Sequence, residues 1–238
     1  MMGLSGLGSR IIAAIEQRQE RNRLQDRSGL GDFYRNGGNT QLYRDLPLNE
    51  ADIVLDVGGY QGEWTSGIMI RYGCRSIVFE PVSSFMDVCK GLFQTNNRVR
   101  LYQAALGANN GTTTFSLAGV GTSEYKGGDG SAAFEARVIG VSDFLQELTR
   151  SGCISDAAGC IGCLKLNIEG GEYGVLQQLI ENGELNRFRS FLIQFHCQPE
   201  GWSESYQKII ASLQVTHRQA WCYPMVWERW DMIENSSQ

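Results

Sequence analysis

The stretch IVLDVGGYQG, at residues 53–62, constrains the fold of this chain more than any other segment. Its first five residues are apolar apart from one acid, which predicts a parallel strand buried on both faces. Gly58, Gly59 and Gly62 follow, and residues without a Cβ permit a tight turn and let a ligand approach bare backbone. A helix is expected directly afterwards. The segment therefore predicts a strand, a glycine turn and a helix that together form one edge of a ligand site.

A second strand with an acid at its carboxyl end follows that helix. The sequence SIVFEP at residues 76–81 places Glu80 22 residues after Gly58. A carboxylate about 20 residues beyond the first glycine is the group that binds a ribose in dinucleotide folds. The two strands and the acid together predict a cofactor that contains adenosine.

The position of Asp56 decides which cofactor is expected. A dinucleotide fingerprint reads G-x-G-x-x-G, whereas this turn reads D-x-G-x-x-x-G. A carboxylate is poorly placed beside a pyrophosphate but attracts a sulfonium and an ammonium, directly or through water. The pattern therefore favours S-adenosylmethionine, and a nicotinamide-dependent oxidoreductase is the alternative. The predicted cofactor-binding residues are Asp56, Gly58, Gly59, Tyr60, Gly62, Glu80, Pro81, Ala104 and Ala105, the two alanines by position beside the adenine.

Strands and helices alternate from residue 52 onward, which predicts an α/β fold with a doubly wound, mostly parallel sheet and helices on both faces. The expected strands lie near 52–57, 75–80, 99–105, 162–168 and 190–196, and the expected helices near 62–72, 83–94, 142–150, 172–182 and 203–213. Residues 213–216 and 225–228 are expected to form a closing antiparallel pair. Residues 112–117 and 136–139 resemble two further antiparallel strands, joined by a glycine-rich loop that is either a substrate lid or a connector.

The N-terminal part is expected to be separate from this alternation. Residues 1–45 are interpreted as a helical extension and loop, and residues 46–238 as the cofactor-binding domain. The first 27 residues have helical spacing and then a run of charges, which indicates a solvated helix whose first turns cover the core. Contact with a second copy, giving a homodimer, and contact with a membrane surface are the alternatives. Residues 29–39, rich in Gly and Asn, are expected to be a loop.

Composition sets broad limits on function. The chain has 238 residues and a formal net charge of -5, which argues against a nucleic-acid binder that relies on basic surfaces. No apolar run reaches the roughly 18 residues of a membrane-spanning helix, and the N-terminus lacks the apolar core of a signal peptide. Seven cysteines, an odd number, suit reduced thiols in the cytoplasm better than a disulfide framework.

A cluster of polar residues follows the expected fourth strand. The sequence LKLNIEGGE at residues 164–172 ends in Asn167, Glu169 and Glu172. Ligands of open α/β sheets lie outside the carboxyl ends of the strands, so these side chains are expected near the reactive end of the cofactor. For Glu172, a role in the first turn of the next helix is the alternative.

Four ordered motifs together resemble the FkbM-like family of S-adenosylmethionine-dependent methyltransferases. They are LDVGGYQG at 55–62, FEP at 79–81, VSDFL at 141–145 and LKLNIEGGE at 164–172. The resemblance covers roughly residues 50–200. It implies a seven-stranded class I methyltransferase sheet with an antiparallel edge strand. It also implies O-methylation, with methyl transfer to a hydroxyl oxygen of a sugar or glycan, a polyketide or another small metabolite.

The chain departs from that family pattern at two positions. The aspartate of the K-x-D block is Asn167, and an acid of the fifth strand is Gln194. Losing two carboxylates weakens a metal-assisted mechanism, because hard cations need anionic oxygen ligands. It also leaves open a partner protein that binds the cofactor without catalysis.

A hydroxyl acceptor would benefit from a general base. His196, at the expected carboxyl end of the fifth strand, is the first candidate because imidazole titrates near neutral pH, and Glu169 is the second. A packed histidine without catalytic duty is the alternative for His196, and His217 is interpreted as structural. The pair Cys160 and Cys163 has zinc-like spacing, but no second pair accompanies it, so no metal is predicted.

Overall fold

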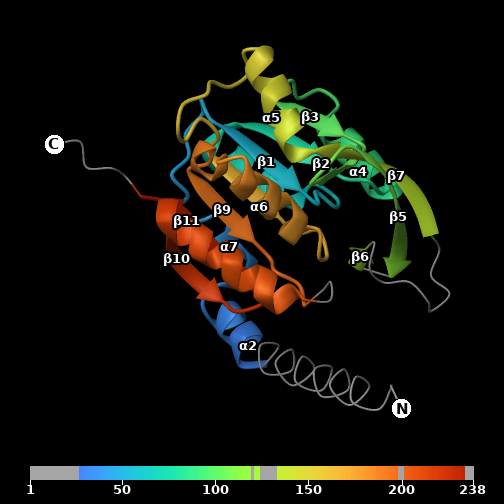
Figure 1. Cartoon of the computed structure of the whole chain (residues 1–238). Coiled ribbons are helices and arrows are strands. Elements are labelled where there is room, and N and C mark those ends of the chain that lie inside the picture. The colour runs from blue at the N-terminus through green and yellow to red at the C-terminus, as the bar shows by residue number, and fades with distance from the viewer. Residues whose placement is uncertain (1–26, 119–120, 124–132, 198–200, 234–238) are drawn as a thin grey trace, which may run out of the picture.

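The computed structural model describes residues 27–118, 121–123, 133–197 and 201–233 (Figure 1). The helices are α2 (Arg27–Arg35), η1 (Gly38–Leu42), α3 (Glu63–Tyr72), α4 (Ser83–Phe93), α5 (Val141–Arg150), α6 (Glu172–Glu181), η2 (Leu185–Arg187) and α7 (Trp202–Thr216). The strands are β1 (Ile53–Val57), β2 (Arg75–Phe79), β3 (Val99–Tyr102), β4 (Ala105–Gly107), β5 (Gly111–Ala118), β6 (Gly121–Ser123), β7 (Ala133–Gly140), β8 (Cys163–Leu166), β9 (Ser190–Ile193), β10 (His217–Tyr223) and β11 (Trp227–Met232).

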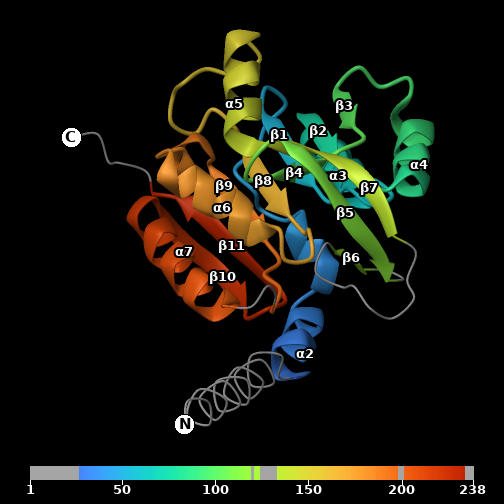
Figure 2. The same ribbon diagram turned by 45° about the vertical axis from the view of Figure 1, so that its right-hand side comes forward.

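The main sheet has seven strands in the order β10-β11-β9-β8-β1-β2-β3. Neighbours from β9 through β3 run parallel, whereas β11 pairs antiparallel with both β9 and β10. Helices α6 and α7 lie across one face of this sheet in Figure 1, and α3 lies on the other side in Figure 2. This order, with its antiparallel edge, confirms the predicted class I methyltransferase sheet.

The central strand β1 is buried on both faces, which explains its almost unbroken apolar sequence. Leu55 and Val57 belong to a large cluster that includes side chains of α5, α6 and α7. Val54 points to the opposite cluster, with Trp64 and Ile68 of α3. Because successive side chains of a strand alternate between faces, a two-sided core requires an apolar residue at nearly every position. Asp56 is the exception, and it marks the functional site.

A second, smaller sheet has the order β4-β7-β5-β6 and extends from the main domain beside α4 (Figure 2). The antiparallel pairing of β5 and β7 confirms the two strands predicted at 112–117 and 136–139. The glycine-rich loop expected between these two strands contains β6, and much of the remainder lies outside the described residues.

Three sequence predictions of local structure were wrong. Residues 29–39 form most of α2 and the start of η1 rather than a loop, because Phe33 and Leu42 are buried in the core cluster of α3. Residues 213–216 complete α7, where the buried Leu213 faces the sheet, so the closing pair is formed by β10 and β11. The expected strand 99–105 breaks at Ala104, whose N–H donates to the Tyr102 carbonyl 2.9 Å away.

The predicted N-terminal helix over residues 1–27, for which a dimer contact was one alternative, lies almost entirely outside the described residues. Among the residues that the structure does describe, no helix combines the length and apolar character needed to cross a membrane.

His217, at the start of β10, is buried and has a structural role, as its position in the sequence indicated. Its Nε2 lies 2.9 Å from the Phe188 carbonyl oxygen and its Nδ1 lies 2.8 Å from the Thr216 hydroxyl. A neutral ring satisfies both contacts, with Nε2–H donating and Nδ1 accepting. Burial lowers the pKa of His217 below its usual value.

We predict that this residue makes stability depend on pH. Because the pKa is lower in the folded state, the unfolded chain binds the proton more readily. The contribution of neutral His217 to the free energy of unfolding is fully present above the unfolded-state pKa of about 6.5. It declines as the pH falls below that value. Urea unfolding at pH 7 and pH 5 should show a smaller loss of stability in His217→Gln, whose amide can still donate to Phe188, than in the wild type. Equal losses in both proteins would contradict the assignment.

Candidate cofactor and active site

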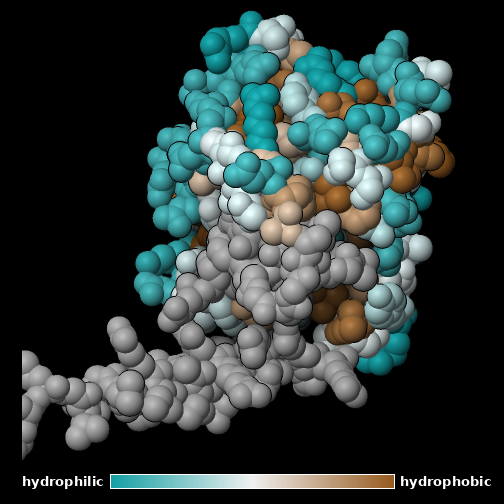
Figure 3. Space-filling model, turned by 90° about the vertical axis from the view of Figure 1, so that its right-hand side faces the viewer, coloured by the Kyte–Doolittle hydropathy of each residue, from teal (hydrophilic) through white to brown (hydrophobic). Residues whose placement is uncertain are grey.

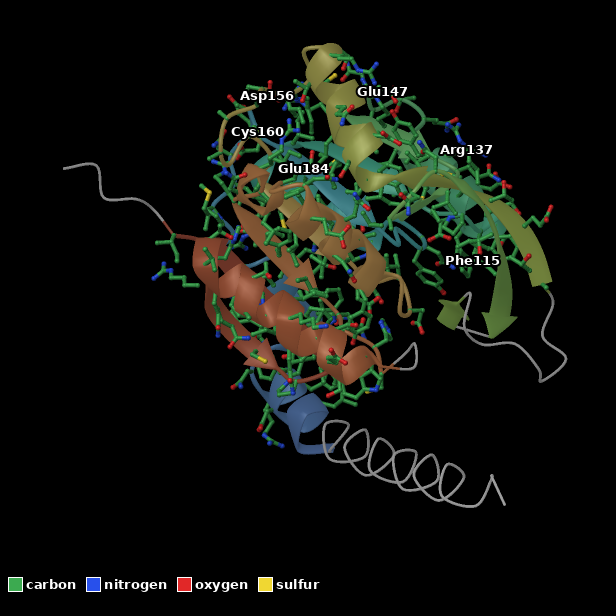
Figure 4. All side chains as sticks on the ribbon, in the orientation of Figure 1. Phe115, Arg137, Glu147, Asp156, Cys160 and Glu184 are labelled. Atoms are coloured by element: carbon green, nitrogen blue, oxygen red, sulfur yellow. The ribbon has the colours of Figure 1, made fainter. Side chains whose placement is uncertain are left out.

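A cavity of about 580 Å³ opens at the carboxyl ends of the central strands. It is lined by the turn after β1, the ends of β2 and β8, the start of β4, part of the second sheet and the segment around α2. Phe115, from β5, lines it from the second sheet (Figure 4). The predicted site residues that line it are Gly58, Gly59, Tyr60, Glu80, Pro81, Ala105, Asn167 and Glu169.

Glu80 places a buried carboxylate in the cavity wall directly after β2. Its two oxygens accept backbone N–H groups from Tyr60, at 2.9 Å, and from Val82, at 2.8 Å. Burial raises the pKa of Glu80 to about 7, although both hydrogen bonds oppose that change. A carboxylate has about four acceptor positions, so this one can still accept hydroxyl groups from a ligand.

The turn after β1 packs so closely against neighbouring strands that only glycine fits at its first two positions. Gly58 has a φ of 79°, and a Cβ there would overlap the Asn167 carbonyl oxygen. A Cβ on Gly59 would overlap the Val78 side chain on the next strand. Both glycines line the cavity, and the Glu80 carboxylate lies beside them, bonded to the next N–H of the turn at Tyr60. A bare-backbone turn beside a fixed carboxylate fits an adenosine-containing cofactor.

Asp56 lies behind the cavity wall, with 0% of its surface exposed. Its carboxylate accepts hydrogen bonds from the Thr65 hydroxyl, at 2.7 Å, and from Lys165 Nζ, at 2.9 Å. The same ammonium donates to the Gly58 carbonyl oxygen at 2.6 Å. The expected direct contact between Asp56 and the cofactor's ammonium does not fit this geometry, because the carboxylate is enclosed and already paired.

A chain of charged groups follows β8 and β9. His196 lies between two carboxylates, with Nδ1 3.1 Å from Glu172 and Nε2 3.4 Å from Glu169. Burial lowers the pKa of His196, but the hydrogen bonds to both acids outweigh it and raise the pKa to about 9. The ring is therefore an imidazolium at neutral pH, so the structure does not favour the predicted general base. Glu172 begins α6 and accepts the Gly170 N–H at 2.9 Å, the helix-start role that we gave as its alternative.

The two positions that depart from the family pattern are neighbours at the cavity. Asn167 and Gln194 directly follow the parallel pair of Leu166 and Ile193, and both line the cavity. The Gln194 N–H donates to the Leu166 carbonyl at 2.9 Å, which continues the ladder. Two amides, able to donate and accept, thus face the ligand at the ends of β8 and β9.

The remaining predicted residues lie near the cavity without lining it. Gly62 has a φ of 81° and packs against Phe93 of α4, so it shapes the turn. Ala104 is buried between β3 and β4, next to the lining residue Ala105. Sequence reasoning gave no role to Lys165, although it falls within the LKLNIEGGE motif. Among the described residues, no group of three or more His, Cys, Asp and Glu side chains is arranged to hold a metal ion.

Comparison with known proteins identifies the family. Residues 56–220 match the methyltransferase FkbM domain. The chain belongs to the FkbM methyltransferase family, and its cofactor is S-adenosylmethionine. The comparison with curated proteins gave no match.

Solved structures resemble this FkbM methyltransferase only distantly. A putative rRNA methylase from Clostridium thermocellum has 10% identity and a TM-score of 0.44, covering 79% of this chain and 89% of that one. A protein from Corynebacterium glutamicum has 9% identity and a TM-score of 0.48, covering 95% and 92%. Aeropyrum pernix fibrillarin, solved with S-adenosyl-L-methionine, has 10% identity and a TM-score of 0.42, covering 80% and 70%. At these scores the family assignment rests on the domain match.

We predict that Asp56 and Lys165 contribute to folding stability as a coupled pair. Lys165→Met leaves a buried carboxylate uncompensated, and breaking such a pair costs about 3–5 kcal/mol of unfolding free energy. The double variant Asp56→Asn, Lys165→Met removes both charges and should recover part of that loss. Urea unfolding of the wild type, the single variants and the double variant measures the coupling. Strictly additive losses would contradict a direct interaction.

Proposed function

We propose that this FkbM methyltransferase transfers a methyl group to a hydroxyl oxygen of a small metabolite or glycan in the cytoplasm. The supporting observation is that the Glu80 carboxylate and the bare backbone of Gly58 and Gly59 line one cavity side by side, joined by the hydrogen bond from the Tyr60 N–H. None of the seven cysteines, all within the described residues, forms a disulfide, which fits a reducing compartment.

The residues that would hold the cofactor follow from this arrangement. Glu80 would accept the ribose hydroxyls, and the turn at Gly58 and Gly59 would pack against the methionine part. Ala105 would border the adenine, where a small side chain leaves room for a flat ring. S-adenosylmethionine supplies a carbon already activated by its sulfonium, so the protein must chiefly align the acceptor and exclude water.

Glu169 is the better candidate to receive the acceptor's proton. It lines the cavity and has a φ of 54°, in the left-handed region that few non-glycine residues adopt. The imidazolium of His196 lies 3.4 Å from its carboxylate, which fixes its direction and leaves His196 as a positioning residue. Asn167, two residues before Glu169 in the same motif, would orient the hydroxyl by a hydrogen bond.

Two other functions can be separated from this one by experiment. A nicotinamide-dependent oxidoreductase would bind NAD in preference to S-adenosylhomocysteine. A non-catalytic partner protein, suggested by the amides at Asn167 and Gln194, would bind S-adenosylhomocysteine tightly but methylate no acceptor in a broad panel of glycosides and hydroxylated metabolites.

We predict that Glu80→Ala weakens S-adenosylhomocysteine binding by about 1–3 kcal/mol, the range of hydrogen bonds to charged groups. Because Glu80 has a pKa of about 7, it loses its charge as the pH falls through 7, and wild-type affinity should fall with it. Glu80→Gln should abolish that pH dependence. Isothermal titration from pH 6 to pH 8 measures both effects, with NAD as the comparison ligand.

The matched control is Glu147→Gln, which removes an exposed acid on α5 that does not line the cavity (Figure 4). It should bind like the wild type. Unchanged affinity in Glu80→Ala would disprove the ribose assignment, and binding of NAD alone would disprove the proposed cofactor site.

We predict that Glu169→Gln lowers turnover at least tenfold on an acceptor found by that panel, while S-adenosylhomocysteine affinity changes little. The same substitution should lower the pKa of His196 from about 9, because one of its two carboxylate partners loses its charge. NMR titration of the imidazole provides that second readout. A normal turnover rate in Glu169→Gln would show that Glu169 is not the general base. An unchanged pKa of His196 would contradict its ion pair with Glu169.

A further inference from the structure

One side of the cavity is formed by residues outside the matched FkbM domain. The domain match covers residues 56–220, and it includes the glycine turn, Glu80 and the amide pair. The other wall comes from the two flanks of the match. These flanking residues are Leu30, Phe33, Tyr34, Asn39, Leu42, Tyr43, Val226 and Trp227, and we call them the flanking wall. The proposed cofactor residues all lie within the match, so the flanking wall is available to the acceptor.

The flanking wall is fixed to the body of the protein. The Trp64 indole N–H donates to the Leu42 carbonyl oxygen at 3.1 Å. The guanidinium of Arg229, on β11, donates to the carbonyl oxygens of Arg44, at 3.1 Å, and Asp45, at 2.7 Å. These bonds tie the segment after α2 to β11 and α3. The wall is therefore preformed, as small-molecule sites usually are.

The outer edge of this wall is apolar and exposed. Leu30 and Tyr34, on α2, are 47% and 63% exposed, although both line the cavity. Apolar side chains gathered at a cavity mouth indicate a binding surface more than isolated ones elsewhere do. Figure 3 shows that the face beside the second sheet carries hydrophilic and hydrophobic residues intermixed. The exposed apolar side chains relevant to binding are therefore those at the cavity, Leu30 and Tyr34.

The charges that line the cavity disfavour an anionic acceptor. Three carboxylates line it, from Glu63, Glu80 and Glu169. Lys165 is the one basic side chain among the described lining residues, and Asp56 neutralises it. Burial, followed by the charges of Glu63 and Asp56, raises the pKa of Tyr43, so its hydroxyl stays neutral. Glu80 is only partly ionised near pH 7 and His196 offsets the charge of Glu169, but a phosphate or carboxylate would still meet acidic groups and no unpaired cation among the described lining residues.

We propose that the flanking wall selects an electrically neutral acceptor that presents a flat apolar surface next to its hydroxyl group. Tyr34 and Tyr43 supply accessible aromatic rings, backed by the buried rings of Phe33 and Trp227, and the amides of Asn39 and Gln194 can supply hydrogen bonds. The inference rests on the proposed methyl transfer, because that proposal assigns the glycine turn, Glu80 and Ala105 to the cofactor and leaves the flanking wall to the acceptor. It makes residues 30–43 and 226–227 the specificity-determining part of the enzyme.

Two dyes with one ring skeleton test the charge and the apolar preference together. N-phenyl-1-naphthylamine is neutral, and 8-anilino-1-naphthalenesulfonate adds a sulfonate to it. Each is titrated by fluorescence into the full chain saturated with S-adenosylhomocysteine. We expect the neutral dye to bind at least tenfold more tightly than the sulfonate. Similar affinities for the two dyes would overturn the proposal, as would binding of the neutral dye to the ligand-free chain that is lost on saturation with S-adenosylhomocysteine.

Variants locate the dye. Tyr34→Ala should weaken the neutral dye about three- to tenfold, the range of one aromatic contact, and leave S-adenosylhomocysteine affinity unchanged. Leu30→Ser should act in the same direction. The matched control is Ile70→Ser, which removes an apolar side chain that is 88% exposed on α3 and does not line the cavity. Equal effects of Ile70→Ser and Tyr34→Ala would overturn the proposal. Failure to bind S-adenosylhomocysteine would instead count against the proposed function.

Discussion

The ion pair between Asp56 and Lys165 is the interaction on which the site depends. It connects two neighbouring parallel strands, β1 and β8, at facing positions of their ladder. Lys165 also donates to the Gly58 carbonyl oxygen, and Thr65 of α3 donates to Asp56. One buried cluster therefore fixes both sides of the glycine turn. A buried pair adds little net stability because both charges lose their hydration. Its value here is positional, since the turn must stay open.

The same cluster explains why the cavity has its electrostatic character. Lys165 is neutralised from behind by Asp56, so the carboxylates at the cavity surface are not balanced by a free cation. A negative cavity suits a cofactor with a sulfonium and an ammonium. His196 offsets part of that charge from outside the lining, between Glu169 and Glu172. The charges that favour the cofactor are also the ones that disfavour an anionic acceptor.

Sequence reasoning succeeded where one local pattern has one physical solution. The five buried residues of β1, the glycine turn and the acid after β2 follow from hydrophobic runs, backbone freedom and spacing. It failed where tertiary contacts decide the conformation. Residues 29–39 look like a loop because of their glycines, yet burial of Phe33 against β10 and the core of α3 makes them helical. Asp56 looked like a ligand contact because no local signal shows that Lys165, 109 residues later, would enclose it.

The sequence by itself determined the sheet architecture, the cofactor turn and the family. Each depends on short contiguous segments and on their order along the chain. The tertiary structure decided which groups face the ligand. Asp56 is buried behind the lining of the cavity, and His196 lies between two carboxylates that keep it protonated. The tertiary structure also joined residues 30–43 to residues 226–227 across the domain. Those outcomes depend on long-range packing, since a pKa and a cavity wall are set by neighbours in space rather than in sequence.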